Sequence, residues 1–356
     1  MIKSFAGLRF IFAFFIFLHH FSVNGKSIFV EGGNLSVSFF FILSGFVLAL
    51  SYGDRMSKKE ISYKDFVVRR LSKLYPMHWV GFVLAILLSI ASHLYNKNVV
   101  FSINDLFIGG MNFLLLQSWI PIGKVYFSFN WASWFLSNLL FFYLAFPFLA
   151  RKIFKNRKKM NIVGFTIAVL VYIVLMVFIP NDYVHKLFYI NPLFRLLDFV
   201  FGVFLFIVYD RYIKHRSYKA SCIISLELFS IIFFAFFVLM LKNYSEIRPY
   251  SVFYFIPIAL LLLTFAYSEQ KGGKKFLSAI FGHKVLIYLG NISFVFFIMH
   301  QLVLRFLYML SKALNISIEN LIGFIFALVI TMIVSVLTHH YIEKPISKFV
   351  NKKLIK

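Results

Sequence analysis

The sequence predicts an all-α integral membrane protein, a bundle of about ten transmembrane helices with both termini in the cytoplasm. Of its 356 residues, 61% are hydrophobic, 21% are aromatic and only 14% are charged. The mean hydropathy is +0.85. A soluble domain of this length has no interior large enough for 50 phenylalanines and 19 tyrosines, whereas lipid accepts them on every outward helix face. The composition therefore excludes a water-soluble fold.

Apolar stretches long enough to cross the bilayer recur along the whole chain. About 20 helical residues span the hydrocarbon, and suitable windows are centred near residues 13, 43, 85, 140, 170, 199, 231, 259, 299 and 331. An even number of crossings brings both termini to the same side. The stretch from 103 to 120 is also apolar, but Asp105 and the Gly109-Gly110 pair favour a re-entrant or interfacial segment over a span.

Lysine and arginine are concentrated in every second loop. The formal net charge of +24 would suggest nucleic acid as a partner of a soluble protein, but here the basic residues lie between apolar stretches. These loops contain Arg55, Lys58, Lys59, Lys64, Arg69, Arg70 and Lys73; Arg151, Lys152, Lys155, Arg157, Lys158 and Lys159; Arg211, Lys214, Arg216 and Lys219; and Lys271, Lys274, Lys275 and Lys284. The positive-inside rule assigns them to the cytoplasm. We therefore predict membrane lipids and no nucleic acid as partners, one membrane domain over residues 1–345, and a basic cytoplasmic tail over 346–356.

Two further features limit the class of protein. Arg9, His19 and His20 interrupt the apolar N-terminal run, and no small-residue cleavage site follows, so we expect a retained first helix rather than a signal peptide. The single cysteine, Cys222, lies in an apolar stretch and argues against a disulfide, a thiol pair or a cysteine-rich metal site. We expect no metal and no bound cofactor.

Ionisable side chains inside the predicted spans are candidate functional residues, because lipid penalises each of them unless it faces protein or water. They are Arg9, His19, His20, Arg195, Asp198, Glu227, His300, Arg305, His339 and His340. Arg195 and Asp198 have i,i+3 spacing, which suits a structural ion pair at least as well as a ligand site. Glu227 is either protonated, paired with a basic residue elsewhere, or close to a reacting histidine.

Arg9 and His20 are separated by eleven positions, close to three helical turns. Both therefore project from one face of the first helix, with about 16 Å of axial rise between them. This spacing fits a long acyl thioester, with its phosphates at Arg9 and its acyl group toward His20. The structural alternative is that Arg9 extends to the lipid headgroups and His20 lies at the outer interface. Arg70 and Lys73, at i,i+3 spacing, suit phosphate binding or ordinary cytoplasmic anchoring.

Six short motifs follow one another along the chain. They are Arg9 with His20 in LRFIFAFFIFLHHF; Phe39, Phe40, Leu43, Ser44, Gly45 and Phe46 in SVSFFFILSGFVLAL; Arg70, Lys73, Tyr75 and Pro76; Trp134, Leu136, Ser137, Tyr143 and Pro147; Arg195, Asp198 and Gly202; and His300 in ISFVFFIMHQ with Glu343 and Pro345 in YIEKP. Together they resemble the bacterial acyltransferase-3 family of membrane O-acyltransferases, and the resemblance runs almost from end to end.

The resemblance implies a reaction and a set of site residues. An acyl group, expected to be acetyl, moves from cytoplasmic acetyl-CoA to a hydroxyl of a cell-envelope glycan or lipid-linked sugar at the bacterial inner membrane. His20 is the expected catalytic residue, as base or as acyl carrier, with Arg9. The acyl-CoA-binding residues are Arg70, Lys73 and Tyr75, and the supporting residues are Ser44, Trp134, Arg195, Asp198, Glu227, His300 and Glu343. For Ser44 the structural alternative is helix packing, and for His300 it is an interior hydrogen bond.

Two positions depart from the family pattern. The family often has aspartate before the paired phenylalanines and glutamate five residues after the tryptophan, where this chain has Ser38 and Leu139. A different acceptor, or another acid such as Glu227 or Asp105 near the histidine, would account for the departures. The rival functions are a transporter or flippase, since buried charges also serve a polar pathway, and a non-catalytic polysaccharide-export accessory protein.

Overall fold

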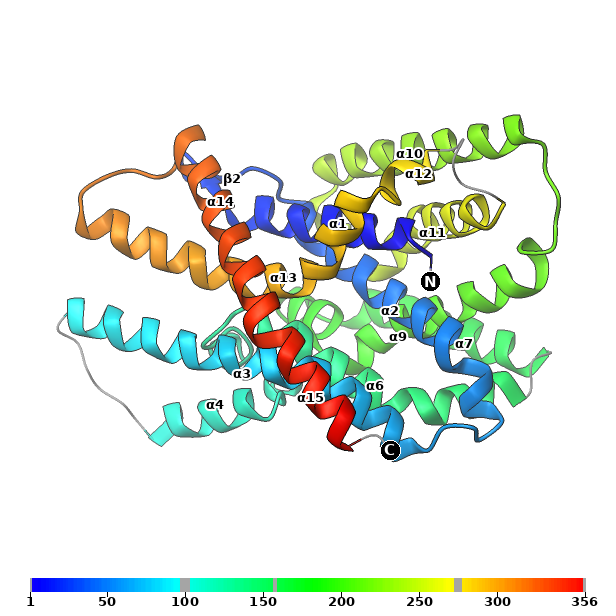
Figure 1. The fold of residues 1–356 in the computed structure, drawn as a ribbon, viewed down its shortest axis with the longest axis horizontal. Coiled ribbons are helices and arrows are strands. Elements are labelled where there is room, and N and C mark those ends of the chain that lie inside the picture. The colour runs from blue at the N-terminus through cyan, green and yellow to red at the C-terminus, as the bar shows by residue number, and fades with distance from the viewer. Residues whose placement is uncertain (1, 97–102, 156–158, 272–276, 355–356) are drawn as a thin grey trace.

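The computed structural model describes residues 2–96, 103–155, 159–271 and 277–354, and these residues form a helical bundle (Figure 1). Its principal helices are α1 Ser4–His20, α2 Gly32–Ser57, α3 Tyr63–Asn96, α6 Ser133–Lys155, α7 Lys159–Phe178, α9 Pro192–Val208, α10 Ala220–Asn243, α11 Phe255–Gln270, α13 Lys284–Ala313 and α14 Leu321–Thr338. Eight candidate spans in the described residues are long and apolar enough to cross a membrane, and α1 and the part of α7 from Val163 to Phe178 are shorter apolar helices. Each predicted window coincides with one of them, so the all-α membrane bundle is confirmed.

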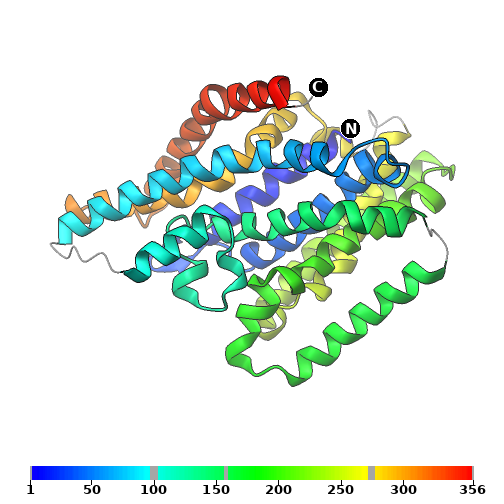
Figure 2. The ribbon, with the colours of Figure 1, turned by 90° about the horizontal axis from the view of Figure 1, so that it is seen from below.

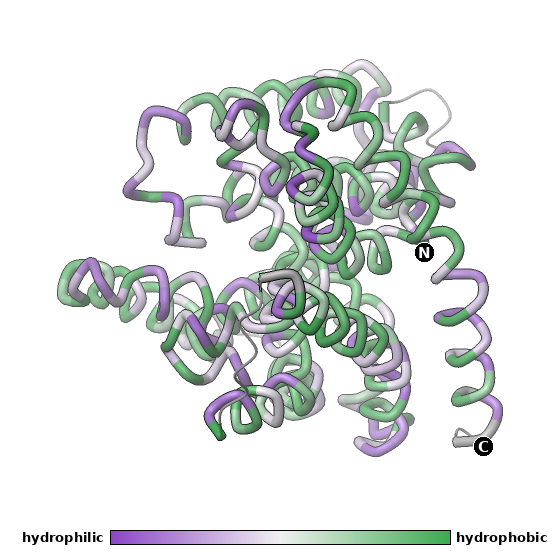
Figure 3. Tube along the Cα trace, turned by 90° about the vertical axis from the view of Figure 1, so that its left-hand side faces the viewer, coloured by the Kyte–Doolittle hydropathy of each residue, from purple (hydrophilic) through white to green (hydrophobic). Residues whose placement is uncertain are grey.

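Short elements connect the principal helices. They are the helices α4 Ile103–Phe113, α5 Gly123–Tyr126, α8 Asn181–Val184, α12 Ser278–Phe281 and α15 Lys344–Leu354; the 3₁₀ turns η1 Gln117–Trp119, η4 Ser245–Ile247 and η5 Ser251–Tyr254; the π-helical turns η2 His185–Ile190, η3 Tyr209–Ile213 and η6 His339–Glu343; and the strands β1 Ser22–Val23 and β2 Lys26–Ser27. Viewed along the long axis of the bundle, hydrophobic residues predominate in the helices, and hydrophilic residues alternate with them in α15 at the C-terminus (Figure 3).

Successive long helices run back and forth along the long axis of the bundle, and the two termini lie at similar positions along it (Figures 1 and 2). This arrangement fits an even number of crossings. Of the basic loop residues used above, Arg157, Lys158, Lys274 and Lys275 lie outside the described residues. The predicted tail is helical in its described part, since α15 extends to Leu354 and packs against α3.

Glycine lets the central helices approach closely. A Cβ atom on Gly202 of α9 would lie 1.9 Å from the Ile42 carbonyl oxygen of α2, and one on Gly45 of α2 would lie 2.0 Å from the Phe199 carbonyl oxygen of α9. The same holds between α13 and α1, where a Cβ on Gly290 would lie 2.0 Å from the carbonyl oxygen of Ala6. Membrane helices pack through small residues in this way because lipid provides no hydrophobic drive to association.

The core lies where α1 and α2 pack against α6, α9 and α13, and aromatic rings fill it. Phe12 of α1 stacks on Phe39 of α2 with ring centroids 3.6 Å apart. Phe41 of α2 stacks on Phe135 of α6 at 4.5 Å. Stacked pairs of this kind stabilise beyond the burial of their area. The apolar composition is thus used inside the bundle as well as on its lipid-facing surface.

The stretch from 103 to 120 does not form a span, as predicted. Helix α4 has 11 residues, a length of about 16 Å, which is too short to cross the hydrocarbon. The side-chain amide of its buried Asn112 donates to Ser128 Oγ at 2.5 Å. The backbone carbonyl oxygen of Asn112 lies 2.9 Å from His78 Nε2 of α3 and accepts a hydrogen bond from it. Farther along, Asn130 donates to the Ile298 carbonyl of α13 at 3.0 Å. These hydrogen bonds satisfy irregular backbone where water is scarce.

A small hairpin follows α1 and fixes its end. Strands β1 and β2 pair antiparallel, and the two residues between them, Asn24 and Gly25, have φ values of 51° and 74°. Asn-Gly is the sequence that favours such a two-residue turn. Glu319, in the loop before α14, accepts from the Asn24 amide at 3.2 Å and from the Gly25 amide at 2.8 Å. The hairpin therefore ties the end of α1 to the loop between α13 and α14.

The crossing of α2 and α9 yields the first testable prediction. Gly202→Ala should destabilise the protein by about 1–3 kcal/mol, because the added methyl overlaps the Ile42 carbonyl and forces the helices apart. The measurement is the thermal unfolding of the detergent-solubilised variant. The control is Gly164→Ala on α7, where an added Cβ meets nothing within 4 Å. Equal melting temperatures for the two variants would contradict the close crossing.

Candidate functional site

Two histidines from opposite ends of the sequence meet in the bundle. His20 is the last residue of α1, and His300 lies in α13 with its side chain fully buried. Their closest ring nitrogens, His20 Nδ1 and His300 Nε2, are 3.2 Å apart. The structure thus brings the predicted catalytic residue into contact with a predicted supporting residue that lies 280 positions away in the sequence.

Main-chain carbonyls define which nitrogen of each ring carries hydrogen. His20 Nδ1 lies 2.9 Å from the Ile16 carbonyl oxygen, and His300 Nδ1 lies 2.6 Å from that of Phe297. A carbonyl only accepts, so we assign the proton of each neutral ring to Nδ1, which leaves Nε2 as the acceptor. His20 Nδ1 then donates to Ile16 and His300 together. His20 Nε2 consequently carries a lone pair that can accept a proton.

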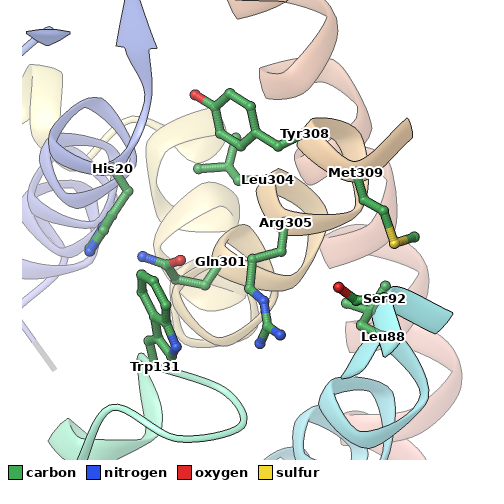
Figure 4. A pocket seen from close by; sticks show the side chains of 9 residues that line it. All are labelled: His20, Leu88, Ser92, Trp131, Gln301, Leu304, Arg305, Tyr308 and Met309. Atoms are coloured by element: carbon green, nitrogen blue, oxygen red, sulfur yellow. The ribbon is translucent and has the colours of Figure 1, made fainter. Parts of the chain in front are cut away.

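His20 lines a cavity of about 300 Å³. The lining residues are His20, Leu88, Ser92, Trp131, Gln301, Leu304, Arg305, Tyr308 and Met309 (Figure 4). They come from α1, α3, the loop before α6, and α13. In the close-up, the Gln301 amide lies between His20 and Arg305 (Figure 4). The cavity therefore offers a reacting group space beside the imidazole, with polar side chains from α13 around it.

Several residues of this cavity were not assigned a site role from the sequence. Arg305 was identified as an ionisable residue in a span, and Gln301, Trp131 and Tyr308 were not singled out. The signal that could have found three of them is helical periodicity, because residues three or four positions apart share one face of a helix. Gln301 lies four positions before Arg305 along α13, and Tyr308 lies three positions after it. Trp131 precedes α6, and only the folded loop brings it there.

A second group of polar residues lies around the N-terminal half of α3. Lys73 is within electrostatic range of Arg70, Arg9 and Glu343. The Arg70 guanidinium donates to the Tyr52 hydroxyl at 2.8 Å and lies over the Tyr52 ring. Helices α1 and α3 thus bring Arg9, Arg70 and Lys73 near one another. We call these three residues the cation cluster.

The cation cluster has unused donors. The Nε atoms of Arg9 and Arg70 are buried without a hydrogen-bond partner among the described residues. A buried donor without a partner is costly, and an anion that accepts from it relieves that cost. Guanidinium groups also match the geometry of phosphate oxygens. The cluster is therefore suited to bind an anionic ligand.

Two supporting residues border the cation cluster. The Tyr143 hydroxyl hydrogen-bonds to Ser44 and lies within electrostatic range of Arg70. Glu343 accepts from His339 Nδ1 at 2.5 Å in the π-helical turn η6, which packs against α3. Ser44 and Glu343 thus lie close enough to affect the cluster, although neither belongs to the cavity at His20.

Arg195 and Asp198 form a buried ion pair of α9, in keeping with the structural interpretation. The Arg195 Nη2 and Asp198 Oδ2 atoms are 2.8 Å apart, and the side chains are 1% and 0% exposed. Arg195 also donates to Ser38 Oγ at 3.1 Å, and its guanidinium carbon lies 4.9 Å from the Phe41 ring centroid. Ser38, at the position where the family often has aspartate, therefore contacts this pair.

Glu227 lies apart from the cavity at His20 and from the cation cluster, and its hydrogen bonds connect neighbouring helices. It accepts from Ser268 Oγ at 2.6 Å and from the backbone amides of Leu277 and Ser278 at 2.7 and 3.1 Å. These contacts join α10, α11 and the start of α12. Both carboxyl oxygens of Glu227 thus accept hydrogen bonds, and no donor in these bonds is a histidine.

Tyr75 and Trp134 pack between elements. The Tyr75 hydroxyl donates to the Leu114 carbonyl at 3.2 Å, which turns it toward the end of α4 rather than toward Lys73. The Trp134 ring lies 4.9 Å from the ring of Tyr189.

Within the described residues, no group of three or more histidine, cysteine, aspartate or glutamate side chains is arranged to hold a metal ion.

A helical membrane bundle with a histidine at a cavity and a separate cluster of cations suits a membrane enzyme. The chain belongs to the acyltransferase-3 family, whose model, described as an acyltransferase domain, matches residues 2–340. The chain is 29% identical over 294 residues to acyltransferase MdmB of Streptomyces mycarofaciens, which covers 77% of this chain and 69% of the relative. The comparison with solved structures gives no match. The protein is therefore an acyltransferase.

The contact between the histidines yields the second prediction. His300→Ala should lower kcat of acyl transfer about 100-fold and leave KM for the acyl donor unchanged, because the His20 ring loses the partner that orients it. His300→Gln, which keeps an acceptor, should retain part of the activity. His340→Ala is the control, since His340 contacts Tyr288 instead. A wild-type kcat in folded His300→Ala would contradict the orienting role.

Proposed function

We propose that the protein transfers an acetyl group from cytoplasmic acetyl-CoA to a hydroxyl of a cell-envelope glycan or a lipid-linked saccharide, in the inner membrane of a bacterium. The observation that carries the proposal is the arrangement along α1. Arg9 belongs to the cation cluster near one end, and His20 faces a cavity at the other end with Nε2 available. One helix thus joins an anion site to a candidate base.

The cation cluster suits the donor. Coenzyme A carries several phosphate charges, which match the unpartnered Nε donors of Arg9 and Arg70 and the ammonium of Lys73. About 16 Å of helix separates Arg9 from His20. A donor bound by its phosphates at the cluster would extend its thioester toward the imidazole.

The chemistry follows from the assigned tautomer. The acceptor hydroxyl gives its proton to His20 Nε2 as its oxygen attacks the thioester carbonyl. The new ester C–O bond forms, the C–S bond breaks, and the imidazolium returns the proton to the departing thiolate of CoA. His300 keeps the ring oriented and accepts from Nδ1 throughout. In the other route, Nε2 carries the acetyl group before the acceptor takes it.

The positions of the two groups favour transfer across the bilayer. With the basic loops in the cytoplasm, the cation cluster faces the compartment that contains acyl-CoA. The cavity at His20 lies toward the opposite side, where envelope glycans are exposed. The family membership favours this function over a transporter, a flippase or a non-catalytic export protein.

Replacement of the histidine tests the chemistry. His20→Ala should reduce transfer of radiolabel from acetyl-CoA to extracted envelope glycans by about 100-fold or more, because the base is removed. The control is His215→Ala, because His215 is exposed between η3 and α10, away from the cavity at His20. Undiminished labelling by His20→Ala would reject His20. Label retained on the wild-type protein when acceptor is omitted would identify the acyl-carrier route.

Removal of a cluster charge tests donor binding. Arg70→Gln should raise KM for acetyl-CoA at least 10-fold, since one charge-assisted contact to phosphate is lost. The same variant should use acetyl-pantetheine, which lacks phosphates, as well as the wild type does. Lys64→Gln, at an exposed position of α3, is the matched control. An equal loss with both donors would show that Arg70 does not bind phosphate.

A further inference from the structure

The cavity beside His20 has a positive side chain and no acidic one. Arg305 lines it, and none of its lining residues in the described chain is aspartate or glutamate. The remaining lining consists of polar, aromatic and aliphatic side chains. Charge in a concave, mostly apolar site acts at a lower effective dielectric than in water, so an anion is attracted there and a cation is repelled.

Arg305 keeps donors for a ligand. Its Nη1 donates to the Phe129 carbonyl, and a guanidinium has five N–H donors in a planar fork. In the close-up, the guanidinium extends between Trp131 and Leu88, into the space that they border (Figure 4). The contact with Phe129 fixes the fork without using all of it. The remaining N–H groups of the guanidinium have the geometry to bind a carboxylate or a phosphate.

The surroundings of Arg305 suit a sugar ring. Trp131 is 48% exposed, so the large apolar face of its indole ring is accessible to a sugar ring. Gln301 supplies both a donor and an acceptor, and Ser92 adds a hydroxyl to the wall. A volume of about 300 Å³ is at the lower end of small-molecule sites. It therefore accommodates a terminal or single residue of a glycan.

We propose that the acceptor is an anionic saccharide, bound with its carboxylate or phosphate on Arg305 and its sugar ring against Trp131, so that a hydroxyl reaches His20 Nε2. This inference rests on the proposed function and narrows its acceptor to a chemical class. Arg305 then determines specificity, because a neutral glycan leaves the guanidinium without a counter-charge in a site from which water has been displaced.

The test uses the purified full-length protein, radiolabelled acetyl-CoA, and envelope glycans of the native host separated by anion exchange into neutral and anionic pools. Label should enter the anionic pool. Carboxyl reduction and, separately, removal of phosphate groups identify which anion is needed, since only one treatment should lower the labelling. Label confined to the neutral pool would overturn this inference and leave the proposed function standing. Label in neither pool would overturn the proposed function itself.

A second measurement separates ligand binding from a structural role of Arg305. Arg305→Gln should lower labelling of the anionic pool at least 10-fold, and Arg305→Lys should retain part of it. Neutralising the acceptor chemically should bring wild-type labelling down to the Arg305→Gln level, and should lower the labelling by Arg305→Gln no further. Lys312→Gln, at an exposed position of the same helix, is the matched control and should behave as wild type.

If Arg305 only supported the loop through its contact with Phe129, the Arg305→Gln variant would behave differently in two measurements. Arg305→Gln would lose activity equally with the native and the neutralised acceptor, and its melting temperature would fall together with the activity. Either equal loss with both acceptors, or unchanged activity with both, would reject Arg305 as the anion-binding residue.

Discussion

The close approach of helices at glycine is the constraint on which the site depends. Gly290 lets α13 lie directly against the backbone of Ala6 in α1, and this contact sets the relative position of the two helices along their length. His20 and His300 meet only because α1 and α13 are held in this way. The hydrogen bonds from each ring to its own helix then fix the ring orientations. Packing thus fixes where the imidazoles lie, and hydrogen bonding determines which nitrogen faces the cavity.

Buried charges in the bundle fall into two kinds. Arg195 and Asp198 neutralise each other on one helix, and Ser38 adds a neutral hydrogen bond where an acid would introduce a second negative charge. Such a pair is costly to break, because a single buried charge would remain. Arg9 and Arg70 form no ion pair with a carboxylate among the described residues. A cation without a counter-charge from the protein indicates an anion-binding site more strongly than burial alone does.

Much of the architecture could be predicted from the sequence because hydropathy is a local property. The predicted windows match the observed helices, and the short α4 agrees with the acid and the glycines in its sequence. The grouping of Arg9 with Arg70 and Lys73 was expected from topology and family motifs. Other relationships were not accessible, because they depend on tertiary contacts. The hydrogen bonds of Glu227, the orientation of Tyr75 toward α4, and the position of Trp131 beside Arg305 have no periodic signal in the sequence.

The hydrogen bond from Asn130 to the Ile298 carbonyl has a consequence for biosynthesis. It joins residues 168 positions apart. At a translation rate of about 5–20 residues per second, α13 emerges roughly 8–34 seconds after the loop that it must support. Until then the polar groups of that loop have no partner on α13, and His20 has no neighbour at Nδ1 other than its own helix. A chain shortened before α13 would therefore lack the partner of His20, and the contact between the two histidines forms only after α13 has been made.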